Sequence, residues 1–300
     1  MGRTNHIAPY GITLVMAGST VLSPAAIRPA VAQTVDPIES VVSAAIAAAP
    51  GRDSSAYSPP SAETVDGIVA GVSDLVRDEK PTVDAYDLVT VGVGNGEASA
   101  LVEEGNPHAG NGLYAVRSDS AAQVPLIVQV PHPIAEFEVE KMGTQLFATT
   151  ESELFMMAGA HRTAGGGSAD VAHRADTAFA AVNEAVVEPG ATVVQLHGFS
   201  QANHQTDFGD IVVSSSVDEP SPAVRKLADD LRGGGFETCM YDGENCGALA
   251  GTVNVEADAA HAHGAEFIHI EVDQDVRRDA GERTRLVNLV AQSLKASGIG

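Results

Sequence analysis

Residues 124–140 read VPLIVQVPHPIAEFEVE, and they join an apolar run to a group of titratable side chains. The run stops at His132, which lies between two prolines, and Glu136, Glu138 and Glu140 follow it. Such a run predicts a buried strand. Imidazole and carboxylate groups at the carboxyl end of a strand face the crevice where open α/β sheets bind ligands. They suit a metal site or an acid–base pair, and a solvated loop is the alternative interpretation.

Other segments of the chain have the same character as this strand. They are short, rich in β-branched or apolar residues and bounded by Gly, Pro or charged residues: DLVTVGVG, GLYAVRS, ELFMMAGA, ATVVQLHG, DIVVSSSV and AEFIHIEV. Helical patterns are predicted over residues 38–49, 62–77, 136–148, 175–187, 222–231 and 282–296. Strands that alternate with helices indicate an α/β fold with a mixed, mostly parallel central sheet and helices on both faces.

The amino-terminal part of the chain differs from the rest. Residues 1–32 combine an early arginine, an apolar stretch and the small-residue sequence AVA, which predicts a signal peptide cleaved near Ala32. We therefore expect a secreted or periplasmic protein. Residues 33–85 hold two helical patterns and the Ser/Pro-rich sequence GRDSSAYSPPS, so we expect a helical and linker segment there. Residues 86–300 then form the α/β domain.

Charge and cysteine content restrict the partners and the compartment. The 300 residues include 40 Asp and Glu against 17 Lys and Arg, a formal net charge of −23, which repels nucleic acid and anionic lipid. No segment after the signal reaches the ~20 apolar residues that a membrane span needs. Cys239 and Cys246 are the only cysteines, and six turn-prone residues separate them, so export predicts a disulfide between them. A two-thiolate metal site is the alternative interpretation of this pair.

Two histidines end predicted strands and offer ligands for a metal ion. His132 closes VPLIVQV and His197 closes ATVVQL, and with Glu136 they could supply three ligands to zinc and leave an open position for water. Glu271 lies on an otherwise apolar strand, FIHIEV, and is the candidate base that accepts a proton from that water. His269 is two residues away on the same strand face and is expected beside the site.

Five segments, in chain order, resemble a known group of enzymes. They are PHPIAEFEVEKMGTQLF, AGAHRTA, ADVAHRADTAF, VVQLHGF and FIHIEVDQDVR. Their order is similar to that of the zinc carboxypeptidase-like superfamily, which includes metallocarboxypeptidases, aspartoacylase and succinylglutamate desuccinylase relatives, and phage poly-γ-glutamate hydrolases. The resemblance covers roughly residues 110–295.

This resemblance implies a zinc site and its base. His132 and His197 would be metal ligands, and Glu271 would be the general base that activates water. The family's usual H-x-x-E spacing is absent, because the nearest acid lies four residues after His132. The carboxylate ligand is therefore Glu136, with Glu140 as the alternative.

The resemblance also implies a set of substrate-binding residues. Arg162 and Arg174 would correspond to the basic residues that hold a substrate carboxylate, since a guanidinium group binds both oxygens at once. Asp170 and His173 fall where the relatives carry the Asp and Asn of a D-x-N-R stretch. Arg277, which follows the strand that carries the base, is included in the same group.

The sequence thus predicts a secreted zinc metallohydrolase of carboxypeptidase or amidohydrolase type. Its substrate would be a small molecule or peptide with a free carboxylate: a peptide, an N-acyl amino acid or a γ-glutamyl polymer. One alternative is an α/β serine hydrolase that uses Ser200 in the sequence GFSQA, with Asp207 and His261 or His263. Another is a secreted binding protein whose hydrolase site has degenerated.

Overall fold

A nine-stranded mixed sheet runs through the part of the chain that the computed structural model describes, which comprises residues 1–2, 35–117 and 125–299. Its strands are β1 (Tyr86–Val93), β2 (Gly96–Glu103), β3 (Leu113–Val116), β4 (Leu126–Val130), β5 (Leu154–Met157), β6 (Thr192–Phe199), β7 (Ile211–Ser214), β8 (Thr238–Met240) and β9 (Glu266–Asp273). They lie in the order β1-β2-β3-β5-β4-β6-β9-β7-β8. The expected signal sequence lies outside the described residues, apart from its first two.

The centre of this sheet is parallel. β5, β4, β6 and β9 are consecutive neighbours that run in one direction. β3 pairs with β5 in the antiparallel sense on one side, and β7 pairs with β9 in that sense on the other. The prediction of a mixed sheet with a parallel centre is confirmed. Because parallel strands end at the same edge of a sheet, the residues that close β4, β6 and β9 come together there.

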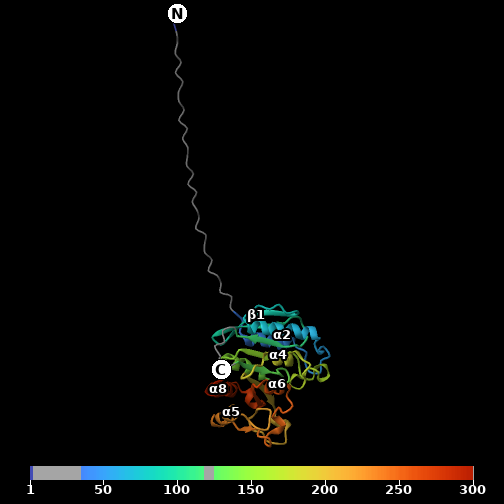
Figure 1. Ribbon diagram of the computed structural model, residues 1–300, viewed down its shortest axis with the longest axis vertical. Helices are drawn as coiled ribbons and strands as arrows, with labels where there is room; N and C mark the ends of the chain where they lie inside the picture. The colour runs from blue at the N-terminus through green and yellow to red at the C-terminus, as the bar shows by residue number, and fades with distance from the viewer. Residues whose placement is uncertain (3–34, 118–124, 300) are drawn as a thin grey trace. The chain divides into compact units, whose positions relative to one another are not determined.

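Helices cover both faces of the sheet, as predicted. They are α1 (Ile38–Ala48), α2 (Ala62–Val76), α3 (Val139–Thr149), α4 (Ala178–Val186), α5 (Pro222–Gly233), α6 (Val255–His263), α7 (Gln274–Arg278) and α8 (Ala280–Ala296). The helices α1, α3, α5 and α8 share one apolar core with the sheet, and α2, α4 and α6 share the other. Figure 1 shows α2, α4 and α6 following one another along the described unit. Since α1 and α2 belong to these cores, residues 35–85 pack in the same compact unit as the sheet.

The chain between β4 and α3 differs from the prediction. The helix begins at Val139 and not at residue 136. The backbone amide of Glu136 instead donates to the carbonyl of His132, at 2.9 Å, which closes a turn. Glu138 then adopts a left-handed conformation with φ of 70° before the helix starts. Glu136 and Glu140 therefore do not share a helix face, and the Glu136 side chain is free to point back toward the end of β4.

Several elements were not predicted from the sequence. β2, β8, α6 and α7 are absent from the predicted set, and two of these are short, with three residues in β8 and five in α7. β2 is Gly- and Glu-containing and pairs with β1 as a hairpin, so its strand character comes from pairing more than from composition. The predicted disulfide between Cys239 and Cys246 is present.

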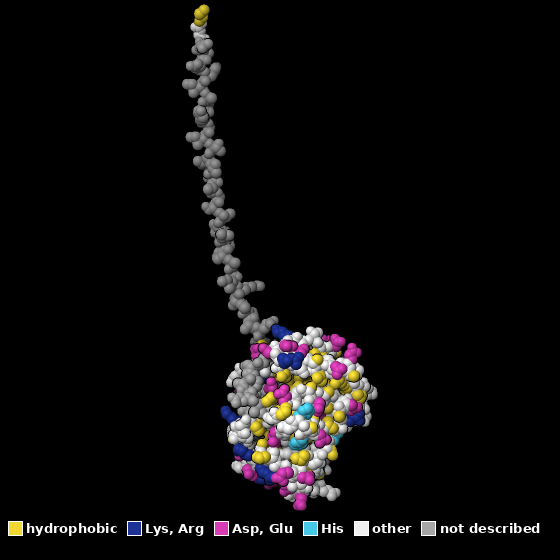
Figure 2. Space-filling view, viewed as in Figure 1, with side chains coloured by type: hydrophobic (Ala, Val, Ile, Leu, Met, Phe, Trp, Pro, Cys, Tyr) yellow, Lys and Arg dark blue, Asp and Glu magenta, His cyan; other side chains and the backbone are white. Residues whose placement is uncertain are grey.

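The surface carries the acidic excess that the composition indicates. Asp and Glu side chains are spread over the face shown in Figure 2, among few Lys and Arg side chains. Among the described residues, none of the helices has the length and apolar character needed to cross a membrane.

Candidate metal centre

His132 and His197 lie side by side at the carboxyl edge of the parallel strands. β4 and β6 pair in register, with Gln129 opposite Gln195, so the residues that follow them emerge at the same level. The two imidazole rings have their centroids 5.0 Å apart and lie edge to face. Both side chains are buried, with exposed fractions of 1% and 4%. The structure therefore brings together two histidines that are 65 residues apart in the sequence.

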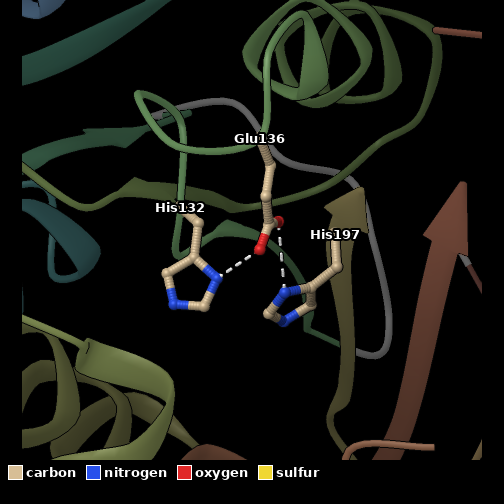
Figure 3. Close-up of side chains that lie close together, drawn as sticks. All are labelled: His132, Glu136 and His197. Atoms are coloured by element: carbon tan, nitrogen blue, oxygen red, sulfur yellow. Dashed lines mark hydrogen bonds and ion pairs between the residues drawn. The ribbon is translucent and has the colours of Figure 1, made fainter. Parts of the chain in front are cut away.

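The Glu136 carboxylate lies between these two rings (Figure 3). Its Oε1 atom is 2.7 Å from Nδ1 of His132, and its Oε2 atom is 3.3 Å from Nδ1 of His197. The turn after β4 places Glu136 there, because the short segment reverses the chain before α3 begins. Burial raises the pKa of Glu136, but the charge of His132 outweighs burial and holds that pKa well below its usual range. Glu136 is thus an ionised carboxylate in contact with both rings.

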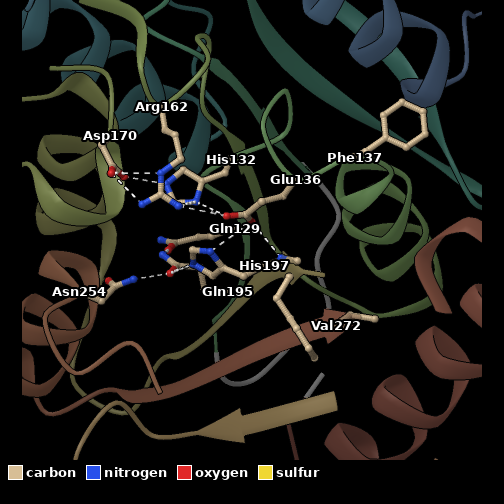
Figure 4. Close-up of polar contacts among 12 residues, drawn as sticks. Gln129, His132, Glu136, Phe137, Arg162, Asp170, Gln195, His197, Asn254 and Val272 are labelled. Atoms are coloured by element: carbon tan, nitrogen blue, oxygen red, sulfur yellow. Dashed lines mark hydrogen bonds and ion pairs between the residues drawn. The ribbon is translucent and has the colours of Figure 1, made fainter. Parts of the chain in front are cut away.

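The outer nitrogen of His132 is held by Asp170. Its Nε2 atom lies 2.8 Å from Oδ1 of Asp170, and Arg162 Nη2 donates to the other oxygen of that carboxylate at 2.7 Å (Figure 4). Burial lowers the pKa of His132, but Glu136 and Asp170 outweigh burial and raise that pKa to about 9. The ring is thereby fixed in orientation, with Nδ1 facing Glu136.

The outer nitrogen of His197 is held by an amide network. Its Nε2 atom lies 2.7 Å from Oε1 of Gln195, which also accepts from Nδ2 of Asn254 at 2.5 Å. Gln195 Nε2 donates to Oε1 of Gln129 at 2.9 Å, and this fixes which end of the Gln195 amide faces the histidine. Because an amide oxygen carries no proton, His197 must donate through Nε2. Burial lowers the pKa of His197, so the neutral ring keeps a lone pair on Nδ1, which faces Glu136.

Glu271 and His269 form the neighbouring wall. β6 and β9 pair in register, which sets His197 beside Glu271 and Gln195 beside His269. The rings of His197 and His269 have centroids 4.6 Å apart. Burial, and next the charge of Glu136, raise the pKa of Glu271 well above its usual range. The expected position of His269 beside the site is what the structure shows.

These side chains line a pocket of about 370 Å³. It is lined by His132, His197, His269 and Glu271, by Arg162 and His173, and by residues of the segment 247–254. The ligand atoms of His132, Glu136 and His197 lie within 4.8 Å of one another. Two imidazole nitrogens and a carboxylate oxygen, each ring anchored through its other nitrogen, are the donor set that zinc prefers in hydrolases. The residues present therefore fit a zinc ion.

Glu140, the alternative carboxylate ligand, lies elsewhere. It is in the first turn of α3, and burial raises its pKa while Glu138, Lys141 and Arg283 act on it as charged neighbours. Its Oε2 atom is buried without a hydrogen-bond partner, away from the histidine cluster. The structure brings Glu136 and not Glu140 to the two rings.

The predicted substrate-binding residues divide into two groups. Arg162 and His173 line the pocket, and both contact Asp170, with Nδ1 of His173 3.1 Å from Oδ1 of that carboxylate. Arg174 is not among the described residues that line the pocket, and it pairs with Asp176 through two hydrogen bonds, one of 2.8 Å from Nε. The prediction that Arg174 binds a substrate carboxylate stays a prediction, and in the structure its guanidinium group pairs with the nearby acid Asp176.

Arg277 is also placed differently from the expectation. It is 3% exposed, and its guanidinium group donates to the carbonyls of Val272, Phe199 and Phe137. A Cβ atom at Gly198 would lie 2.4 Å from the guanidinium carbon, so a side chain there would displace the guanidinium group. Arg277 therefore ties together the ends of β6 and β9 and the turn that carries Glu136. It does not line the pocket.

The serine hydrolase alternative lacks its geometry. β6 leads into a short 3-10 helix at Gln201–Asn203 and not into the α-helix that a nucleophile elbow requires. The ring of His261 bonds the carbonyl of Ser215, and His263 pairs with a carboxylate on α4. In the described contacts, neither histidine is paired with Ser200.

Comparisons with known proteins give distant structural matches only. No family model matches the chain, and no curated protein matches it. Two solved structures that match are hydrolases by their names. A bacteriophage poly-gamma-glutamate hydrolase is 11% identical, with 61% of this chain and 88% of that chain covered and a TM-score of 0.44. An N-formylglutamate amidohydrolase from Ralstonia eutropha is 13% identical, with 59% of this chain and 95% of that chain covered and a TM-score of 0.39. A metallo-carboxypeptidase from Burkholderia cenocepacia also matches, with 13% identity, 81% of this chain and 69% of that chain covered, and a TM-score of 0.40. At these scores they assign no activity to this chain, and the function proposed below rests on its own side chains.

The amide network is what sequence reasoning missed. Gln129 and Gln195 each interrupt an otherwise apolar strand, LIVQV and TVVQLH, and a polar side chain buried in a strand must find a partner. That signal could have identified both residues. Asn254 and Glu256 gave no such signal, because they precede and begin a helix that was not predicted.

Proposed function

We propose that this chain is an exported zinc-dependent hydrolase that cleaves an amide or peptide bond adjacent to a carboxylate. The observation that carries the proposal is the pair of buried imidazoles of His132 and His197. Each is anchored through Nε2, and each turns Nδ1 toward the carboxylate of Glu136. His132, Glu136 and His197 would hold the ion.

The protein groups around this centre have separate tasks. A bound zinc ion supplies a Lewis acid and makes water nucleophilic near neutral pH. Glu271 lines the same pocket beside His197 and accepts the proton of the attacking water. Since burial makes this carboxyl group easy to protonate, it can hold the proton and pass it to the leaving nitrogen.

Substrate orientation falls to the cationic side of the pocket. Arg162 is about one-third exposed there. Asp170 holds its Nε and Nη2 atoms, whereas the contacts of Nη1 with Glu136 and His132 are both 3.4 Å long, so a substrate carboxylate can replace them. His173 stands next to it on the rim, with 44% of its side chain exposed. We infer that these two residues, without Arg174 and Arg277, select substrates that carry a carboxylate near the scissile bond. Peptides, N-acyl amino acids and γ-glutamyl chains share this feature.

Export is a further element of the proposal. Its support is the sequence of residues 1–32 and the disulfide between Cys239 and Cys246, which forms in oxidising compartments. Expression of the full chain with its first 32 residues, followed by amino-terminal sequencing of the exported product, tests cleavage near Ala32.

The test of the reaction separates the ligand from the base. His197→Ala should lose both zinc and hydrolysis of a panel of N-acyl amino acids and γ-glutamyl peptides. Glu271→Gln should keep zinc and lose at least about 100-fold in kcat, because a general base contributes about 10² to 10⁴-fold. The matched control is Glu140→Gln, a partly buried glutamate outside the cluster, which should keep both.

Three results would contradict the proposal. Full turnover by Glu271→Gln removes the base assignment. Loss of zinc in Glu140→Gln transfers the carboxylate ligand to that residue. A purified protein that takes up no zinc, yet hydrolyses its substrate and is blocked by a serine-directed inhibitor, replaces the metallohydrolase with the serine enzyme.

A further inference from the structure

Glu256 is a buried carboxyl group that the proposed reaction does not use. It lies in the first turn of α6, and none of its surface is exposed. Its Oε2 atom accepts a hydrogen bond from Nε2 of Gln195 at 3.4 Å, whereas its Oε1 atom is buried without a partner among the described residues. Because buried polar atoms are nearly always paired, this carboxyl group costs stability and calls for a role.

A single amide connects Glu256 to a metal-binding histidine (Figure 4). The oxygen of Gln195 accepts from Nε2 of His197 at 2.7 Å, and its nitrogen donates to Glu256 on one side and to Gln129 on the other. Asn254 supports this link at both ends. Its Nδ2 atom donates to the oxygen of Gln195, and its Oδ1 atom accepts from the backbone amide of Glu256. Charge on the carboxyl group can therefore act on His197 through an amide that is fixed in orientation.

The surroundings of Glu256 keep its carboxyl group protonated at neutral pH. Burial raises the pKa of Glu256 to about 8, and the negative charge of Asp170 also raises it. The positive charge of His132 lowers that pKa, but not enough to offset burial. Asp170 is itself paired with Arg162 and His173, so its contribution is partly neutralised.

The helix and the strand that pack against α6 add no compensating charge. On α4, Asn183 is an uncharged amide that donates to the backbone carbonyl of Glu256. Glu184 on the same helix pairs with His263 of α6, and both of these side chains are partly exposed. On β9, burial lowers the pKa of His269, so its ring is neutral. The cation that acts on Glu256 thus lies at the metal centre.

A divalent ion at this centre would change the protonation of Glu256. An ion held by His132, Glu136 and His197 carries two positive charges, where a protonated His132 carries one. More positive charge near a carboxyl group lowers its pKa, and that of Glu256 is only about one unit above neutral. The first turn of a helix also favours a carboxylate over a neutral acid. The ionised form then accepts a charge-assisted bond from Gln195, which polarises the amide and strengthens its bond to His197.

We propose that Glu256 is a positioning residue of the metal centre, which loses its proton when the ion binds and then holds His197 through the amide of Gln195. The O–H bond of the carboxyl group breaks, its electron pair stays on the carboxylate, and the proton passes to the solvent. This inference rests on the zinc site of the proposed function but not on the reaction. Because linkage is reciprocal, an ion that makes Glu256 more acidic is bound more tightly when Glu256 is ionised.

The experiment counts the protons that leave when the ion binds. Metal-free full-length protein is titrated with Zn²⁺ in a calorimeter, in buffers of different ionisation enthalpy. At pH 7, Glu256→Gln should release about one proton fewer than the wild type. At pH 9 the carboxyl group of the metal-free wild type is already ionised, so this difference should nearly vanish.

Affinity and stability should change in opposite directions in the same variant. Glu256→Gln should bind zinc about 10 to 100-fold more weakly in chelator competition, because His197 loses the charge that strengthens its amide partner. The metal-free variant should nevertheless be more stable to urea than the wild type, since a buried acid has been removed. General damage to the structure would lower both quantities.

Controls separate Glu256 from the other buried acids. Glu266→Gln removes a glutamate that burial also makes harder to ionise, but this residue begins β9 and is bonded to Ser221, away from the amide network. It should release as many protons as the wild type. In a Glu271→Gln background, the further change Glu256→Gln should still remove about one proton at pH 7.

Infrared spectroscopy tests the inference without any change at Glu256. In Glu271→Gln, zinc added to the metal-free protein should remove the carbonyl absorption of a protonated carboxyl group. A carboxyl absorption that zinc leaves unchanged overturns the inference, even if no Glu256 variant folds.

The outcomes distinguish this inference from the proposed function. Equal proton release at pH 7 by the wild type and a folded Glu256→Gln variant, or a difference that persists at pH 9, overturns the inference and leaves the hydrolase intact. A difference of one proton in a protein that hydrolyses none of the substrate panel supports the role of Glu256 and contradicts the proposed function.

Discussion

Replacing Gln195 with leucine tests whether the buried amide network sets the metal affinity. Gln195 accepts from Nε2 of His197 at 2.7 Å and from Asn254 at 2.5 Å, and donates to Gln129 at 2.9 Å and to Glu256 at 3.4 Å. Leucine has a similar volume and no polar atoms. His197 would then lose the acceptor that fixes its tautomer, and its lone pair would no longer be held toward Glu136.

The magnitude follows from these contacts. Loss of a partner that orients a metal-binding histidine lowers metal affinity by about 10 to 100-fold, which corresponds to about 1.4 to 2.7 kcal/mol. Stability should fall as well, because each buried polar group left unpaired costs about 1 to 3 kcal/mol. A loss of affinity alone would therefore not separate positioning from general damage.

The matched variant is Gln195→Glu. The introduced carboxylate can still accept hydrogen bonds from His197 and Asn254, but it cannot donate one to Gln129. It also places a second acidic group beside Glu256. Both variants should be less stable in chemical unfolding, but only Gln195→Leu should bind zinc at least tenfold more weakly in chelator competition. The reasoning is refuted if a folded leucine variant binds zinc as tightly as the wild type, or if both variants lose affinity equally.

Three further predictions concern stability. Burial raises the pKa of Glu256 to about 8, above its usual 4.5, so the carboxyl group ionises at lower pH in the unfolded chain and the free energy of unfolding falls as pH rises between these values. Glu256→Gln should flatten this pH dependence and stabilise the protein by up to about 5 kcal/mol at pH 8. Urea unfolding across this pH range measures both effects, and an unchanged slope would contradict the prediction. Gly198→Ala should displace Arg277 from its three carbonyls and lower stability by about 1 to 3 kcal/mol, which a wild-type melting temperature would disprove. Replacing Cys239 and Cys246 by serine opens a loop with a sequence separation of seven. This change should lower the free energy of unfolding by about 2 kcal/mol in urea unfolding, and an unchanged free energy would contradict the prediction.

The sequence could predict the place of the site because strand ends and parallel pairing determine it. His132 and His197 close apolar runs, and parallel neighbours end at one edge, so their meeting follows from the alternation of strands and helices. Glu271 is set beside His197 by the same logic. The bounds of the predicted helices also follow the apolar periodicity, apart from the starts of α3 and α4, which lie three residues later than predicted.

The remainder depends on contacts that local sequence does not specify. Whether Glu136 sits in a helix or in a turn was decided by the reversal at Glu138, a residue type that rarely adopts a left-handed backbone. Arg174 and Arg277 carry the same charge as Arg162. Only the fold shows that Arg174 pairs with a neighbouring carboxylate and that Arg277 donates to three backbone carbonyls. Sequence alone gives the chemistry of a guanidinium group but not its partner.

The position of β9 in the sheet has a consequence for biosynthesis. This last strand of the chain lies in the interior, between β6 and β7, and it brings Glu271 with it. A ribosome delivers residues in order, so β7 and β8 stay separate from β6 until residue 273 has been made. The wall that His269 and Glu271 form beside His197 is therefore the last part of the pocket to be completed.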